Sequence, residues 1–338
     1  MTPFLAGVSV LDCSIWRPGP YATSLLVHLG ADVLKVEPPG GDPMRQYPEL
    51  FESVNAGKRS TVLDLKTPEG RARAMDLAAE ADVLVEGFRP GVMARLGLGH
   101  ETVRTHNPKI VYCSISGYGQ EDDRAQLPGH DLNYQAWAGA LSPEGQSPSM
   151  PPLPLADLAS GMSAAFGICA ALVGRGSTGQ GTYLDISMTD VMSTWTGAAT
   201  ATSEQAGKER SVPGYGLFRT SDGRQLALGV VSEPHFWSAL CHELGLSELA
   251  ELTFDERTRR GAELNDRLTD AIGQQDLDSV VSALCQAAVP VAPVLDRRAM
   301  VAGAPFPPFP IRLDATHTAR SHSRAPAVDE HRGEGFPP

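Results

Sequence analysis

The first 37 residues of the chain predict a strand, a helix and a second strand in direct succession. Apolar residues at 7–11 and 32–37 indicate two strands, and the intervening segment, 20–29, is typical of a helix. Parallel strands need a crossover of this kind, because the helix carries the chain back along the sheet. This unit therefore restricts the chain to an α/β fold more strongly than any other local feature.

The rest of the first half repeats this alternation. Strands are predicted at 61–64, 82–86 and 110–116, and Thr67-Pro68-Glu69 marks the start of a helix that ends near residue 79. Together these elements predict an open, mostly parallel sheet covered by helices. Beyond them we expect a helix over 158–172, a strand over 182–188 and a helix over 189–205.

A charged segment that becomes rich in proline and glycine, 208–215, predicts a linker between two domains. The large domain spans 1–207 and a small α+β domain spans 216–302. The small domain is expected to contain a hairpin around Ser221-Asp222-Gly223-Arg224, three helices and a last strand, at 216–220, 225–231, 234–244, 261–274, 277–287 and 291–295. The polar tail, 303–338, is expected to return toward the large domain or to be disordered.

Composition excludes several classes of function. The formal net charge of −12 argues against non-specific nucleic-acid binding, which needs a basic surface, but it allows an anionic ligand at a local basic cluster. No run of about 18 apolar residues occurs and residues 1–10 do not resemble a signal peptide, so we expect no membrane span. Five widely spaced cysteines without a CxxC pattern indicate reduced thiols and a cytoplasmic location.

The strand–helix–strand unit also raises the possibility of a dinucleotide site. Its turn is Arg17-Pro18-Gly19-Pro20-Tyr21, however, and lacks the three glycines that let the backbone approach a pyrophosphate. We therefore expect no nicotinamide cofactor at this turn.

Ordered motifs along the chain are more specific than any single one of them. They include Pro128-Gly129-His130-Asp131-Leu132-Asn133-Tyr134 and Leu155-Ala156-Asp157-Leu158-Ala159-Ser160-Gly161, preceded by Val10-Leu11-Asp12, Gly19-Pro20, the segment 29–37, Asn55-Ala56-Gly57-Lys58-Arg59-Ser60, Leu63-Asp64-Leu65-Lys66, Phe88-Arg89-Pro90-Gly91-Val92-Met93 and Arg95-Leu96-Gly97. This series resembles the family III CoA-transferase superfamily, and within it the α-methylacyl-CoA racemases. The resemblance covers about residues 5–300.

A CoA site needs cationic side chains for its phosphates and apolar surface for its adenine. The candidate cations are Arg17, Lys58, Arg59, Lys66, Arg89 and Arg95, although each could equally be a solvated surface charge. The resemblance implies CoA contacts at Trp16, Arg17, Leu63, Lys66, Gly87, Phe88 and Arg95, and we add Arg89. Many relatives have an arginine where this chain has Pro38-Pro39, so we expect weaker phosphate binding there or a different side chain in its place.

His130 is the first candidate proton carrier. A lone histidine is more often structural, but this one follows proline and glycine in a loop, which suits a side chain that projects into a cleft. Histidine can gain or lose a proton near neutrality. Asp131, Asn133 and Tyr134 are expected to support this loop.

Asp157 is the second candidate, at the predicted start of an apolar helix. Its plain alternative is a helix N-cap, a role compatible with catalysis because a helix N-terminus offers amide donors to a developing enolate. By the resemblance, Glu233 is a small-domain glutamate that orients the histidine; otherwise it is an ordinary first-turn acid.

The resemblance implies that His130 and Asp157 lie on opposite faces of the α-carbon of a 2-methylacyl-CoA thioester. One removes the proton, and the other returns one to the planar enolate, with backbone N–H groups near Asp157 stabilising its oxygen. No metal or cofactor beyond the CoA moiety of the acyl-CoA substrate is expected. The resemblance also implies an interlocked, ring-like homodimer in which Glu233 reaches the site of the partner chain.

Two other functions stay open at this point. A family III CoA transferase would use Asp157 as a nucleophile and form an acyl-aspartyl anhydride. Transferases of this superfamily generally lack the histidine, so His130 favours the racemase. A CoA-binding protein without turnover is disfavoured because both proton carriers are present.

Overall fold

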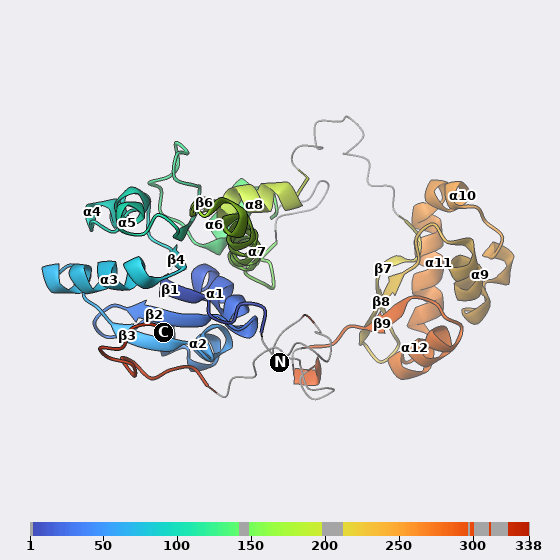
Figure 1. Ribbon diagram of the computed structural model, residues 1–338. Helices are drawn as coiled ribbons and strands as arrows, with labels where there is room; N and C mark the ends of the chain where they lie inside the picture. Colours follow the sequence, from blue (N-terminus) through green and yellow to red (C-terminus); the bar gives the residue numbers. More distant parts are fainter. Residues whose placement is uncertain are drawn as a thin grey trace. The chain divides into compact units, whose positions relative to one another are not determined.

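A computed structural model of the 338-residue chain describes residues 3–141, 149–197, 212–296, 298–300, 311 and 324–337. The chain divides into a large unit, Met1–Glu204 with Pro308–Pro338, and a small unit, Gln205–Pro307. Figure 1 shows the elements of each unit. Most of the predicted linker, 208–215, and most of the first part of the tail, 303–323, lie outside the described residues.

The large unit is built on a six-stranded parallel sheet in the order β3-β2-β1-β4-β5-β6. The strands are β1 Ser9–Cys13, β2 Asp32–Glu37, β3 Arg59–Val62, β4 Val83–Glu86, β5 Val111–Ser116 and β6 Thr182–Ser187. The predicted parallel α/β sheet is therefore confirmed, with strand ends displaced by one or two residues. In this order the chain leaves β1 on one side for β2 and on the other for β4, which makes the β1–β4 boundary a topological switch point.

Helices cover both faces of the sheet. They are α1 Pro18–His28, α2 Pro48–Asn55, α3 Pro68–Glu80, α4 Val92–Arg95, α5 His100–His106, α6 Asp131–Trp137, α7 Leu155–Thr178 and α8 Met188–Trp195, with a 3₁₀ turn at Pro43–Gln46. The shorter helices α2, α4, α5 and α6 were not predicted, because their sequences are too short for a clear apolar period. The helix predicted over 189–205 ends at Trp195, and residues 198–205 lie outside the described part.

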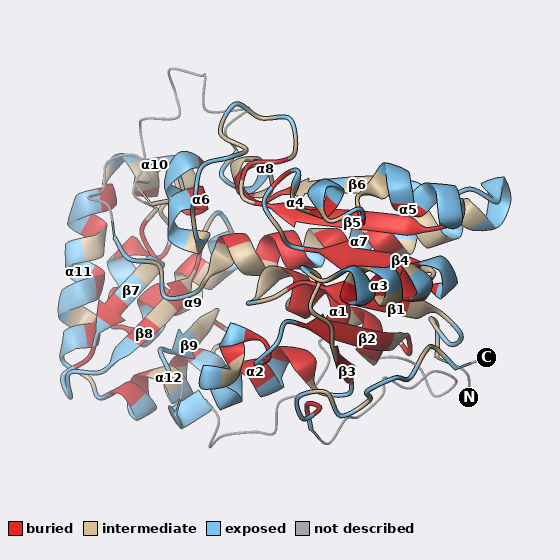
Figure 2. Cartoon of the chain, turned by 90° about the vertical axis from the view of Figure 1, so that its left-hand side faces the viewer, coloured by how far each residue is buried: buried red, intermediate tan, exposed pale blue. Residues whose placement is uncertain are grey.

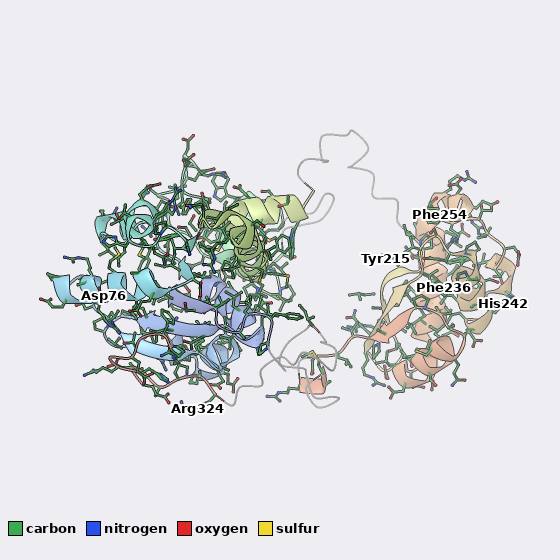
Figure 3. The ribbon with its side chains drawn as sticks, in the orientation of Figure 1. Asp76, Tyr215, Phe236, His242, Phe254 and Arg324 are labelled. Atoms are coloured by element: carbon green, nitrogen blue, oxygen red, sulfur yellow. The ribbon has the colours of Figure 1, made fainter. Side chains whose placement is uncertain are left out.

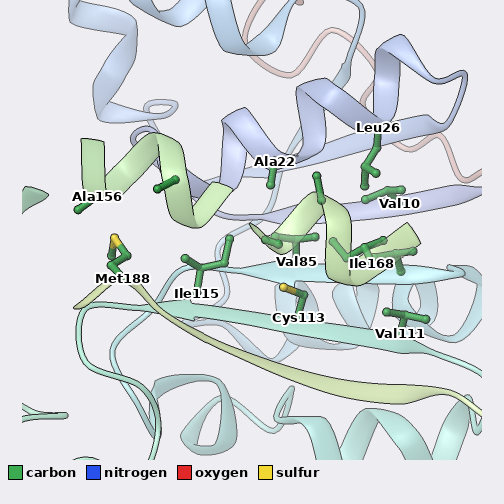
Figure 4. Close-up of a cluster of buried hydrophobic side chains, with 14 of the residues drawn as sticks. Val10, Ala22, Leu26, Val85, Val111, Cys113, Ile115, Ala156, Ile168 and Met188 are labelled. Carbon is green, nitrogen blue, oxygen red and sulfur yellow. The ribbon is translucent and has the colours of Figure 1, made fainter. Parts of the chain in front are cut away.

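Alternate residues of each strand face opposite layers. Val10, Val83 and Val111 pack toward α1, α7 and α8, whereas Leu11 and Leu84 pack toward α3, α4 and α5. Figure 4 shows the first of these clusters between the sheet and the helices, and Figure 2 shows how thoroughly the central strands are buried. Because both faces are covered, the central strands are buried along most of their length, including the charged residues Asp12, Lys35 and Glu86.

The helices α1 and α7 approach each other closely. A Cβ atom at Gly161 would lie 2.6 Å from the carbonyl oxygen of Pro18, so only glycine fits at this crossing. The contact places the first turn of α7 beside the start of α1. Asp157 lies in the first turn of α7, and Arg17 directly precedes α1.

Among the described helices, the 24-residue α7 has the length and composition of a membrane span. Part of its surface is buried in the sheet core, where Ala156, Ala164 and Ile168 pack. Core helices of soluble proteins have the same composition. The composition of α7 is therefore only weak evidence for a membrane span.

The described end of the tail, residues 324–337, lies along the edge strand β3. The backbone N–H of His331 donates to Ser60 O at 2.9 Å, and Asp329 accepts the Val62 N–H at 2.8 Å. Arg324, labelled in Figure 3, begins this segment. An exposed sheet edge would otherwise present unpaired backbone groups, so the tail protects β3.

The small unit has an antiparallel sheet in the order β7-β8-β9. Its elements are β7 Tyr215–Arg219, β8 Gln225–Gly229, α9 Pro234–Glu243, a 3₁₀ turn at Ser247–Leu249, α10 Phe254–Arg259, α11 Gly261–Gly273, α12 Leu277–Gln286 and β9 Val291–Pro293. The buried Arg257 guanidinium lies 4.9 Å from the centroid of the Trp237 ring and donates to Val231 O. The predicted hairpin, three helices and last strand are present, and α10 was not predicted.

Candidate active site

The large unit contains a cavity of about 710 Å³ at the carboxyl ends of its central strands. Residues that follow β1, β4 and β5 line it, namely Ile15–Pro18, Gly87–Pro90 and Ser116–Gly117. The cavity therefore lies at the switch point of the sheet, where open α/β sheets bind their ligands. Its floor joins the apolar core, because Ile115 and Met188, labelled together in Figure 4, also line it.

The segment after β1 supplies Trp16 and Arg17. Trp16 has a φ of 63°, in the left-handed region that a bulky side chain rarely adopts, and its side chain is 40% exposed. Such backbone strain is most often found at binding sites. Arg17 is the N-cap of α1 and makes no ion pair with a carboxylate of the described residues.

The segment after β4 supplies Gly87, Phe88 and Arg89. The buried carboxylate of Glu86 holds it, because its Oε2 accepts the Phe88 N–H at 2.8 Å. Burial raises the pKa of Glu86 to about 7. Arg89 is exposed and has no ion-pair partner within the described residues, so it is available to an anion.

His130 directly precedes α6 and lines the cavity as an exposed side chain. Its backbone N–H donates to Asn133 Oδ1 at 3.0 Å, and the Tyr134 hydroxyl donates to Gly129 O at 2.6 Å. A Cβ atom at Gly129 would lie 2.7 Å from the Tyr134 ring, so glycine is needed there. The predicted support of this loop by Asn133 and Tyr134 is confirmed.

Asp157 lines the same cavity from the first turn of α7. It does not cap the helix, as its plain alternative required: Pro154 is the N-cap, and the Asp157 N–H donates to Asp131 Oδ1 at 3.1 Å. That amide is therefore already occupied and is not free for an enolate oxygen. Burial, together with the negative charge of Asp131, raises the pKa of Asp157 to about 7, although Arg17 opposes this shift.

Seven of the predicted site residues thus line one cavity: Trp16, Arg17, Gly87, Phe88, Arg89, His130 and Asp157. Leu63, Lys66 and Arg95 do not line it. Leu63 packs in the apolar cluster that includes Phe88, and Lys66 and Arg95 are exposed. These three stay predicted CoA contacts.

Glu233 lies in the small unit at the N-cap of α9. Its Oε2 accepts the Val231 N–H at 3.2 Å, and such backbone hydrogen bonds lower its pKa. Glu233 therefore lies one position before the first turn of α9, and its carboxylate bonds to the preceding loop rather than to the helix. Its predicted role beside His130 stays a prediction.

Two of the candidate phosphate-binding cations are wrong. Lys58 is buried and donates to Asp12, Pro20 O and Asn55, so none of its protons is left for a ligand. Arg59 pairs with Asp32 and with Glu334 of the tail. Sequence patterns could not show these pairings, because the partners come from distant segments.

No described cation takes the place of the arginine expected near Pro38-Pro39. The nearest cation before it in sequence, Lys35, is buried and pairs with Asp42. The nearest after it, Arg45, makes a two-fold contact with the buried Glu37 and also donates to Pro326 O. It is therefore committed to holding the tail against the large unit.

Several cavity residues were missed by sequence reasoning. They are mostly apolar and come from unpredicted α2 or from core strands and loops: Ile15, Met44, Tyr47, Leu50, Ile115, Leu127 and Met188. Tyr47 and Leu50 are exposed at this cavity, and exposed large apolar residues often mark a binding surface, but this exposure could not be read from the sequence.

Comparison with known proteins places the chain in one family. Residues 5–306 match CoA-transferase family III. The Homo sapiens alpha-methylacyl-CoA racemase is 38% identical over 72% of this chain and 65% of that protein. The Acetobacter aceti acetyl-CoA:oxalate CoA-transferase is 31% identical over 96% of this chain and 92% of that protein.

Solved structures show the same architecture. Rv3272 from Mycobacterium tuberculosis has a TM-score of 0.88 at 28% identity, and a CAIB/BAIF family protein from Brucella suis has a TM-score of 0.84 at 28% identity. Both comparisons cover 98% of this chain and 98% of the other. On the extent of these matches, the chain is a member of CoA-transferase family III, as the sequence motifs implied.

Proposed function

We propose that this protein is a racemase that inverts the α-carbon of 2-methylacyl-CoA thioesters. The observation that carries the proposal is the placement of His130 and Asp157 in one cavity with two unpaired arginines, Arg17 and Arg89. Imidazole and a carboxyl group with a pKa of about 7 can both exchange protons at neutral pH.

The reaction needs two proton transfers. One group takes the α-proton, and the electron pair of the C–H bond moves onto the thioester oxygen to form an enolate. The other group then donates a proton to the opposite face of the α-carbon. His130 and Asp157 exchange these roles between the two directions, so the pair carries one proton in each reactive state.

The lining of the cavity also offers the groups that a CoA moiety needs. Arg17 and Arg89 offer guanidinium groups to phosphates, and Trp16 and Phe88 offer apolar surface to adenine. Trp16 has a positive φ, and its large aromatic side chain lines the cavity next to that of Arg17. Lys66 and Arg95 extend this set as exposed cations.

The transferase is the second candidate, because relatives named as transferases match at similar identity. In that reaction ionised Asp157 attacks the thioester carbonyl and displaces the CoA thiolate. His130 favours the racemase over this step, because covalent exchange through Asp157 needs no second proton carrier, whereas the raised pKa of Asp157 fits either reaction.

The deciding experiment uses a 2-methylacyl-CoA of single configuration in D2O. We expect α-deuteration and inversion with the unaltered protein, both measured by mass spectrometry and chiral separation. His130→Ala and Asp157→Ala should each abolish inversion and confine any exchange to one configuration. His106→Ala and Asp76→Ala are matched controls, since both residues are exposed and lie outside the cavity.

Transferase activity has a different result. Labelled free acid would then enter the acyl-CoA pool without α-deuteration, and hydroxylamine would cleave the acyl-aspartyl anhydride, leaving a hydroxamate on Asp157 or on the released acyl group. That outcome would overturn the racemase.

The proposal includes a homodimer in which Glu233 of the partner subunit approaches His130. Mixing inactive His130→Ala and Glu233→Ala chains tests it, because a heterodimer would contain one site with both residues intact. Recovery of inversion on mixing supports the shared site, and no recovery from chains shown to exchange contradicts it.

A further inference from the structure

Asp131 connects the two segments that carry the proposed proton carriers. It is the first residue of α6, directly after His130, and it lines the cavity. Its Oδ1 accepts the Asp157 N–H at 3.1 Å, across the contact between α6 and α7. One side chain therefore joins the helix start beside His130 to the helix start that holds Asp157.

The second carboxylate oxygen is also committed. Asp131 Oδ2 accepts from Gln135 Nε2 at 2.6 Å, and the Gln135 residue is 1% exposed. This buried amide, one turn further along α6, fixes the rotamer of Asp131. With both oxygens held, the carboxylate has little freedom to turn away from α7.

Two charged side chains act on the Asp157 carboxyl, and Asp131 is the negative one. Arg17 faces Asp157 from the start of α1, and Asp131 faces it from α6, with opposite effects on its acidity. The Tyr134 hydroxyl of α6 also lies within electrostatic reach of Asp157, but it donates its hydrogen bond to Gly129 O and not to the Asp157 carboxyl. The acidity of Asp157 therefore depends on a balance between one guanidinium and one carboxylate in addition to burial.

We propose that Asp131 is a positioning residue for proton transfer, which holds Asp157 relative to the His130 loop by its hydrogen bond and places a negative charge beside the Asp157 carboxyl. This proposal rests on the proposed racemase function. Asp131 takes no proton from the substrate itself: it acts through the Asp157 amide by a hydrogen bond and through the Asp157 carboxyl by its charge.

Two substitutions separate the two effects. Asp131→Asn removes the charge but keeps an oxygen that can accept the Asp157 N–H. Asp131→Ala removes both the charge and the acceptor. Asp76→Asn on α3 is a matched control, since it removes one exposed aspartate charge far from the cavity lining.

The first measurement is the pKa of Asp157, obtained by ¹³C NMR titration of aspartate-labelled protein with Asp157→Asn for assignment. Removing a nearby negative charge stabilises the ionised carboxyl, so Asp131→Asn should lower the pKa of Asp157 by about one unit. Asp76→Asn should leave it unchanged. An unchanged pKa of Asp157 in Asp131→Asn would overturn the electrostatic part of the proposal.

The second measurement is the pH profile of α-deuteration. In the direction in which Asp157 removes the α-proton, the acidic limb of kcat/KM should move to lower pH in Asp131→Asn, because the Asp157 carboxyl then loses its proton more easily. In Asp131→Ala kcat should fall roughly tenfold or more with KM little changed, because misplaced groups lose rate. Equal kcat in Asp131→Ala and the unaltered protein would overturn the positioning part.

The two levels of failure are distinguishable. If the unaltered protein deuterates no acyl-CoA, the proposed function fails, yet the NMR titration still measures the effect of Asp131 on Asp157. Circular dichroism of both variants checks folding, and Asp131→Asn preserves the hydrogen bond if Asp131→Ala unfolds.

Discussion

Two aspartates of the large unit, the buried Asp12 and the partly buried Asp157, have side-chain pKa values shifted in opposite directions. Burial alone would raise the pKa of Asp12, but Lys58 and Lys35, with the hydroxyls of Ser14 and Thr23, hold it well below its usual range. Burial raises the pKa of Asp157 to about 7, because its neighbours are the negative Asp131 and a single opposing arginine. The same type of side chain is thus ionised in one place and able to bind a proton near neutral pH in the other.

The cations of the two regions differ in the same way. Lys58 is buried, and its three protons have three acceptors at 2.9 to 3.0 Å. Lys35, also buried, pairs with Asp42 at 2.8 Å. Arg17 and Arg89 at the cavity have no carboxylate partner within the described residues. Charges that hold the fold are mutually neutralised, whereas charges left for a ligand are not.

The largest expected effect tests the cavity side of this comparison. Asp157→Asn removes one proton carrier with little change in volume, so inversion of a 2-methylacyl-CoA should fall by about 10²- to 10⁴-fold. Kinetics with chiral product analysis would measure this loss. Asp76→Asn should retain full activity, and an active Asp157→Asn would remove Asp157 from the proposed mechanism.

The next effect tests the structural side. Lys58→Met leaves Asp12 buried without its hydrogen-bonded cation, which should lower the free energy of unfolding by about 3 to 5 kcal/mol. Urea denaturation followed by circular dichroism measures it. The double variant Asp12→Asn with Lys58→Met should be less destabilised than Lys58→Met alone; equal destabilisation would show that the two side chains do not act as a pair.

A smaller effect compares a free arginine with a paired one. Arg89→Ala removes a guanidinium available to a phosphate, and a hydrogen bond to a charged group contributes about 1.5 to 3 kcal/mol, so KM for acyl-CoA should rise roughly 10- to 100-fold. Arg59→Ala should leave KM unchanged, because Arg59 already pairs with Asp32. If KM changed to a similar extent in both variants, the lack of an ion-pair partner at Arg89 would not explain CoA binding.

The smallest effect concerns stability and pH. The folded-state pKa of Asp157, about 7, lies above its unfolded value, so the folded protein binds the extra proton and its stability falls as pH rises from about 4 to 7. Asp157→Asn removes this dependence. It should match the unaltered protein at pH 4 and exceed it at pH 8 by about 1 to 2 kcal/mol, allowing for solvent screening. If Asp157→Asn and the unaltered protein had equal free energies of unfolding at pH 8, ionised Asp157 would not destabilise the folded protein.

Local sequence predicted much of the parallel sheet. The alternation of short apolar strands with helices was sufficient for the strands at 7–11, 32–37 and 82–86, because burial on both faces leaves largely apolar runs. It missed α2 and α6, which are short and hold their places through tertiary contacts such as that of Tyr134 with Gly129. Helices of this length are rarely stable by propensity alone.

The sequence by itself determined the α/β class, the family and the candidate proton carriers His130 and Asp157, because periodicity and ordered motifs are written along the chain. Only the tertiary structure decided which charges are free. Lys58 and Arg89 are both plausible phosphate ligands in the sequence, yet one is buried against Asp12 and the other is exposed at the cavity. The physical reason is that ionisation and pairing depend on burial and on partners from distant segments, which come together only when the sheet and its helices pack.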